Sequence, residues 1–121
     1  MKNDLKHRTL LFANSILDMV ELLPNNTAAK VITNQIVRSA TSVGANYRAV
    51  NRARSDKEFI SKLNIVLEES DETHYWLELI NLRNWLPSES LSPLISEANE
   101  LTAIFVSSLK TVKERLDETK N

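Results

Sequence analysis

The side chains of this 121-residue chain that could do chemistry include an aspartate and a histidine with helical spacing. Asp71 and His74 stand at positions i and i+3, which on a helix brings a carboxylate and an imidazole to one side, as in metal-binding bundles. Such sites need further ligands, but the other histidine, His7, lies far away in the first segment, and there is no cysteine. The sequence therefore predicts no metal site and no cofactor.

Carboxylates at 68–72 and hydroxyls at 39–42 are the remaining candidates for catalysis. A hydrolase with paired carboxylates needs a cleft, which a filled helical core does not supply. No histidine lies near the hydroxyls in the expected hairpin, and hydroxyls on helices usually bond to the carbonyl four residues earlier. We therefore predict no catalytic residue, no enzymatic activity and no small-molecule substrate.

Composition indicates one all-α domain spanning residues 1–121. A hydrophobic content of 42% suits a single core, while one glycine and three prolines are too few for the turns of a β-protein. The absence of cysteine fits a reducing compartment, so the expected location is cytoplasmic. Acidic residues interrupt the apolar stretch near the start, and we expect neither a signal peptide nor a membrane span.

Apolar residues recur in steps of four and three along four segments, which predicts an antiparallel up-down-up-down four-helix bundle. The expected helices cover residues 5–23, 28–54, 56–85 and 93–117. Thr27 is the expected cap of the second helix. Ser55 and Glu58 have the spacing of a capping box for the third, and Ser92 with Pro93 has the signature of the start of the fourth.

The second helix contains the chain's single glycine, Gly44, at a position where alanine would favour the helix by roughly 1 kcal/mol. Close packing explains such a residue, so we expect Ala40, Gly44 and Tyr47 to form a helix-packing face. A short turn near Ser55 pairs residues whose numbers sum to about 110, which places Gly44 opposite Val66.

The same register places Arg38 opposite an acidic segment of the third helix. Ala40 falls opposite Ser70, and Arg38 falls opposite Glu72. An arginine near a helix seam needs a carboxylate to offset its desolvation, so we predict an ion pair of Arg38 with Glu72 or Glu69.

The first and third helices carry more apolar faces than a single bundle can bury. Contiguous apolar patches are rare on soluble monomers, so this excess predicts a homo-oligomer. The expected subunit contacts are Tyr75, Leu79 and Leu82, or alternatively Leu10, Leu17 and Val20.

The formal net charge is −1, yet the expected topology separates basic from acidic residues along the bundle. Basic residues gather at the end that holds the turn between the second and third helices. Weak, sequence-independent nucleic-acid binding there through Arg48, Arg52, Arg54 and Lys57 is one hypothesis. Against it, mixed charges are screened beyond about 8 Å, and no aromatic residues interleave the basic ones.

Several segments resemble the bacterial four-helix bundle proteins first noticed inside intervening sequences of large-subunit ribosomal RNA genes. They are residues 38–47 (RSATSVGANY), 53–55 (ARS), 59–60 (FI), 62–63 (KL) and 72–79 (ETHYWLEL). The resemblance implies a ring-like homopentamer without established enzymatic activity. Many family members have arginine at the position of His74, so a role tied to that cation does not carry over.

The chain is also similar to accessory proteins of diversity-generating retroelements, which are strongly basic pentamers that bind nucleic acid and a reverse transcriptase. Two functions therefore remain open. One is a structural or adaptor oligomer that binds itself and other proteins. The other is an oligomer that binds nucleic acid or a nucleic-acid enzyme.

Overall fold

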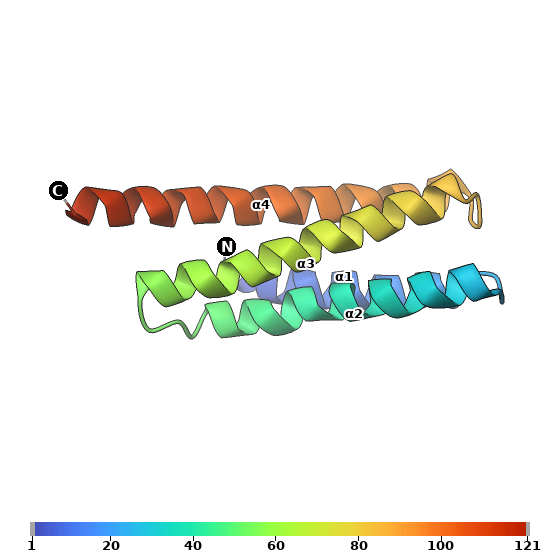
Figure 1. Ribbon diagram of the computed structural model, residues 1–121, viewed down its shortest axis with the longest axis horizontal. Helices are drawn as coiled ribbons and strands as arrows, with labels where there is room; N and C mark the ends of the chain where they lie inside the picture. Colours follow the sequence, from blue (N-terminus) through green and yellow to red (C-terminus); the bar gives the residue numbers. More distant parts are fainter. Residues whose placement is uncertain (1, 121) are drawn as a thin grey trace.

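Four helices make up the chain in a computed structural model, which describes residues 2–120 and the side chains of residues 5–118. They are α1 (Lys2–Val20), α2 (Thr27–Val50), α3 (Asp56–Leu82) and α4 (Ser88–Lys120). Consecutive helices are joined at alternate ends of an elongated bundle (Figure 1). No strand occurs within residues 2–120, so the predicted all-α bundle is confirmed. Residues 1 and 121, part of the expected domain, lie outside the described residues.

The starts of α2 and α3 follow local capping chemistry, and the structure corrects one of the two predicted caps. Ser55 caps α3 as expected, its side chain accepting a hydrogen bond from the Glu58 amide at 3.1 Å. Asn26, not Thr27, caps α2 by accepting a bond from the Ala29 amide at 2.8 Å. The cap thus lies one position before the predicted Thr27, because the side-chain oxygen of asparagine also accepts a hydrogen bond from a free amide in the first turn of a helix.

The fourth helix begins at Ser88, before the expected start at residue 93. Pro93 therefore lies inside α4, in its second turn. Because proline has no N–H, the bond to the carbonyl four residues earlier is lost there, and the helix continues beyond it. The added turn contains Leu91, which is fully buried. Burial of this side chain compensates for the poor helix propensity of the proline.

The first three helices end three or four residues before their predicted ends. After α1, the amides of Leu22 and Leu23 bond to carbonyls three residues back, which tightens the chain into a turn. After α3, Asn84 adopts a left-handed conformation with φ of 57°, which asparagine tolerates better than most residues. The apolar repeat continues through these turns, so periodicity alone overestimates the helix lengths.

The core lies where the repeat positions of the four helices meet. Ile16, Ile36, Leu77 and Phe105 are all fully buried, one from each helix. The pairs α2–α3 and α3–α4 pack most extensively, whereas α1 and α4 make the fewest contacts. No helix within residues 2–120 combines the length and apolar character that a membrane span requires.

Gly44 packs against α1, not against α3 as the antiparallel register predicted. A Cβ added to it would lie 3.1 Å from Thr9 Oγ1 and 3.5 Å from the Thr9 carbonyl carbon. The predicted register related only α2 to α3, and it did not specify which face of α2 is turned toward α1. Ala40 is fully buried, and the Tyr47 ring lies 5.9 Å from that of Phe105 in α4, so Gly44 and Tyr47 pack against different helices.

Candidate interaction surfaces

A groove between α1 and α2 forms the first candidate surface, with a volume of about 640 Å³. Small residues at its floor, Gly44 and Ala45, let the two helices approach and leave the surface concave. We call it the basic groove, because Lys6, Arg48 and Arg52 line one end and the apolar Leu10 and Leu17 line the remainder. Its other lining residues are Thr9, Ala13, Asn14 and Thr41.

The basic groove contains two of the four residues predicted to bind nucleic acid. Arg48 and Arg52 are exposed and form no ion pair with residues 5–118. Arg54 lies in the turn between α2 and α3, with its Nε 3.5 Å from Glu58 Oε2. Lys57 is exposed in the first turn of α3. The structure therefore groups Arg48 and Arg52 with Lys6, and does not bring Arg54 or Lys57 into that groove.

A stripe along the outward face of α3 forms the second candidate surface. Tyr75 and Leu82 are 58% and 77% exposed, although both are large and apolar in character. Two exposed acidic residues precede Tyr75 and a third lies between Tyr75 and Leu82, all at helical spacing. We call this set the acidic stripe, and it comprises Glu68, Asp71, Tyr75, Glu78 and Leu82.

Two of the residues predicted at subunit contacts belong partly to the core of the chain itself. Leu79 and Val20 are half-buried and pack against the hydrophobic core. Leu10 and Leu17 are 52% and 40% exposed and line the basic groove. The exposed apolar surface on α1 and α3 is thus narrower than periodicity indicated. The basic groove and the acidic stripe each hold two large exposed apolar side chains, and further ones, among them Leu22 and Val31, lie outside both surfaces.

Arg38 joins α2 to α3 through both glutamates proposed as its partners. Its Nη1 lies 3.1 Å from Glu69 Oε2, and its Nη2 contacts Glu72 Oε2. The Trp76 indole also donates a hydrogen bond to Glu72 Oε2 at 3.0 Å. Burial tends to raise the pKa of Glu72, but the bonds from Trp76 and Arg38 hold that pKa below its usual value of 4.5.

His74 and two of the hydroxyl candidates for catalysis are engaged in local interactions, whereas Glu68 and Asp71 form no ion pair with residues 5–118. His74 Nδ1 lies 3.1 Å from Glu78 Oε1, one turn along α3, and so pairs with this residue instead of Asp71. Ser39 and Thr41 hydroxyls donate to the carbonyls of Ile36 and Val37. Among the described residues no three His, Cys, Asp or Glu side chains are grouped to hold a metal ion.

Buried and half-buried hydroxyls form two bridges between helices that the sequence analysis did not identify. The Thr73 hydroxyl donates to Ser39 Oγ at 2.8 Å, joining α3 to α2. Ser70 Oγ and Thr102 Oγ1 lie 2.8 Å apart and join α3 to α4. The available signal was that Ser70 and Thr73 occupy core positions of the α3 repeat, where a polar side chain needs a partner.

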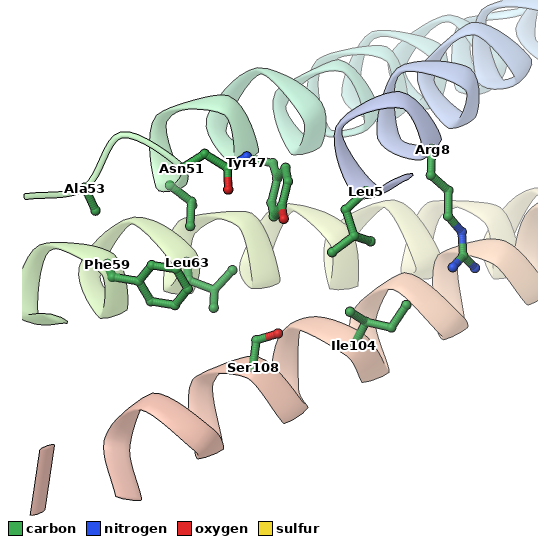
Figure 2. Close-up of a pocket in the computed structure, with 10 residues that line it drawn as sticks. Leu5, Arg8, Tyr47, Asn51, Ala53, Phe59, Leu63, Ile104 and Ser108 are labelled. Atoms are coloured by element: carbon green, nitrogen blue, oxygen red, sulfur yellow. The ribbon is translucent and has the colours of Figure 1, made fainter. Parts of the chain in front are cut away.

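A cavity of about 610 Å³ opens at the end of the bundle near the α2–α3 turn. Figure 2 shows the Tyr47 side chain from α2 reaching into it, facing Leu5 from α1 and Ser108 from α4. Burial raises the pKa of Tyr47, while a hydrogen bond with the Asn51 side chain acts in the opposite direction. The cavity walls are mainly apolar, and Val50, Phe59, Leu63 and Ile104 are among their residues.

Arg8 at the rim of this cavity makes a third link between helices that was not foreseen. Its Nε and Nη2 each lie 2.7 Å from the Glu97 carboxylate, a bidentate arrangement, and Nη2 lies 3.0 Å from Glu100 Oε1. This interaction bridges α1 and α4, the least closely packed pair of neighbouring helices. Arg8 and Glu97 are 89 positions apart, and no periodic pattern in the sequence predicts a contact between them.

Comparison with known proteins identifies one matching family model, described as "23S rRNA-intervening sequence protein", which matches residues 1–107. Among solved structures, the chain is similar to a protein of unknown function from the S23 ribosomal protein family of Bacteroides thetaiotaomicron. The two are 37% identical with a TM-score of 0.80, and the match covers 88% of this chain and 98% of the other. No curated protein matches the chain.

Proposed function

Because this chain belongs to the 23S rRNA-intervening sequence protein family, we propose that it is a non-enzymatic, homo-oligomeric structural or adaptor protein. The observation that carries the proposal is the exposure of large apolar side chains along α1 and α3. Leu10, Tyr75 and Leu82 are each more than half exposed in the single chain. Covering them with a second subunit removes apolar area from water at roughly 25 cal/mol per Å².

The pentameric number comes from the family resemblance, and a cytoplasmic location stays a prediction. Support for a non-enzymatic role comes from the engaged side chains, since Ser39, Thr41 and His74 each have a partner one turn away on the same helix. A hydroxyl that donates to a backbone carbonyl is not activated as a nucleophile.

Light scattering on a size-exclusion column tests the proposal. We expect a mass several times the 13.8 kDa of the single chain at micromolar concentration, and five times that mass for the pentamer. A mass of one chain at that concentration contradicts the oligomer. Substituting Lys110, which is exposed on α4 outside both surfaces, with alanine provides a control that keeps the mass of the wild type.

One observation favours nucleic-acid binding as a second candidate function. Lys6, Arg48 and Arg52 share one end of the basic groove, and none of them forms an ion pair with residues 5–118. Unpaired cations grouped in a concave surface attract a polyanion by local field, whatever the net charge.

Filter binding of RNA at low salt tests this second candidate. We expect Arg48→Glu with Arg52→Glu to abolish retention, and Arg54→Glu with Lys57→Glu to lower it less, because Arg54 already faces Glu58. Retention by the wild type should fall steeply with salt, as counterion release requires. Equal retention by the wild type and by the Arg48 and Arg52 variant excludes the groove as the site.

A further inference from the structure

We infer that the acidic stripe of one copy binds the basic groove of a second copy, so that the chain associates through two different surfaces. This inference rests on the proposed function, because it requires self-association, and it assigns the contact. The two sets of contact residues predicted as alternatives become the two halves of one interface.

The two surfaces have matching residue spacings. On α1 the groove residues Lys6, Leu10, Ala13 and Leu17 follow steps of four, three and four. The stripe residues Asp71, Tyr75, Glu78 and Leu82 follow the same steps. Steps of this kind keep side chains on one helix face, so α3 of the second copy can lie parallel to α1 with its stripe in the groove.

The charges of the two surfaces are complementary. Glu68 and Asp71 begin the acidic stripe, and Arg48 and Arg52 stand at the basic end of the groove. All four side chains are exposed, and none has an ion-pair partner among residues 5–118. Bringing them together therefore breaks no ion pair within either described chain, and opposite charges across a contact fix its register.

Apolar and small residues are matched in the same register. Since Gly44 lies against Thr9 and the two helices are antiparallel, Ala45 lies about level with Arg8, roughly 3 Å along the bundle from Leu10. With Asp71 beside Lys6, the Tyr75 ring falls on Leu10, and the small Ala45 side chain, which lies between the levels of Lys6 and Leu10, leaves it space. Leu82 then falls beside Leu17.

One polar residue of each surface is also matched. Asn14 lines the groove between the positions that receive Tyr75 and Leu82, and its amide can donate to Glu78. Glu78 keeps a second oxygen for His74, its neighbour within the chain. The stripe and the groove thus agree in spacing, charge and polar pairing over three turns of helix.

This contact is heterologous, and it shifts each copy along the bundle relative to the next. Ser39 is level with Thr73, so the groove residues of α2, between 41 and 52, are level with about residues 60–71 of α3. Most of the acidic stripe lies further along α3 than this segment. The shift is about 6 residues, or roughly 9 Å at 1.5 Å per residue. A ring then closes only when each bundle is tilted against the ring axis, and an untilted contact continues as a filament.

Charge exchange in sedimentation experiments at low salt tests the contact. The groove variant carries Arg48→Glu and Arg52→Glu, and the stripe variant carries Glu68→Lys and Asp71→Lys. The matched controls are Lys110→Glu with Lys113→Glu and Glu114→Lys with Asp117→Lys, which make equal charge changes on the exposed side of α4. Circular dichroism verifies that every variant keeps its helices.

We expect the groove and stripe variants each to sediment as monomers, and an equal mixture of the two to associate again. A single chain that carries both exchanges should also associate, because its groove and stripe remain complementary with the signs reversed. If the wild type associates and the groove variant associates as well as the controls, or if the mixture stays monomeric, the contact is wrong and the oligomer stands. A monomeric wild type contradicts the proposed function itself.

Discussion

Gly44 of α2 lies directly against Thr9 of α1, with the position of a Gly44 Cβ only 3.1 Å from Thr9 Oγ1. That distance is shorter than an ordinary van der Waals contact, and Thr9 is fully buried and cannot move into solvent. The single glycine of the chain thus sets the spacing of the α1–α2 pair and forms the floor of the basic groove.

We predict that Gly44→Leu lowers the free energy of unfolding by about 1–3 kcal/mol, because overpacking outweighs the gain in helix propensity. In contrast, Gly44→Ala in a Thr9→Ala background should be more stable than Thr9→Ala alone by up to about 1 kcal/mol, since the hydroxyl that blocks the new Cβ is gone. Urea unfolding of the four proteins measures both effects. A Gly44→Leu variant with a raised midpoint contradicts the packing explanation.

The hydroxyl bridge between Thr73 and Ser39 gives a prediction about the core. Both residues are fully buried, Ser39 Oγ donates to Ile36 O, and the single Thr73 hydroxyl hydrogen is shared between Ser39 Oγ and Glu69 O, each 2.8 Å from Thr73 Oγ1. Ser39→Ala and Thr73→Val should each lower the free energy of unfolding by about 1 kcal/mol.

The double variant should lose less than the sum of the two single losses, because the shared bond can be lost only once. Thermal and urea unfolding of the cycle measures the coupling. The exposed Thr111, which donates to Ser107 O within α4, is the control, and Thr111→Val should leave the stability nearly unchanged. Strictly additive losses at Ser39 and Thr73 argue against a stabilising bridge.

The fold could be predicted because it follows from local and periodic signals. Apolar steps of four and three place Ile16, Ile36 and Leu77 in the core without knowledge of any partner. The Arg38 pairing with Glu69 and Glu72 was also accessible, since a short turn fixes the register of neighbouring helices. In each case a single geometric rule connects residues on the same or consecutive helices.

The relationships that sequence reasoning missed depend on how each helix is rotated about its axis. Gly44 was expected to pack against α3 and packs against α1, and Arg8 contacts Glu97, which lies 89 positions further along the chain. The concave shape of the basic groove follows from the first of these contacts. Periodicity indicates which face of a helix is apolar, but it does not tell which of several neighbours covers that face.

Glu72 gives a prediction about acid stability. Hydrogen bonds from Trp76 and Arg38 hold its pKa in the folded chain below the usual 4.5, so the unfolded chain binds the proton more readily. The stabilising effect of the carboxylate is therefore present above pH 4.5 and is lost as the pH falls through the lowered pKa.

We expect Glu72→Gln to lower the free energy of unfolding at pH 7 and to reduce its decline between pH 5 and pH 3. Urea unfolding at a series of pH values measures the free energy of unfolding at pH 7 and its decline with pH for both proteins. Glu89→Gln, at an exposed residue in the first turn of α4, is the matched control. Identical pH slopes for the wild type and Glu72→Gln contradict the assigned role of the pair.

The bidentate contact of Arg8 with Glu97 carries the last prediction, which concerns the weakly packed α1–α4 pair. Arg8→Lys keeps the charge but cannot form the two parallel bonds, so it should destabilise nearly as much as Arg8→Met. Both side chains remain partly accessible to water, and screening limits the expected loss to about 1 kcal/mol. Hydrogen exchange should show faster opening of α1 in both variants, with α3 amides little changed, and full retention of α1 protection in Arg8→Lys contradicts the need for the bidentate geometry.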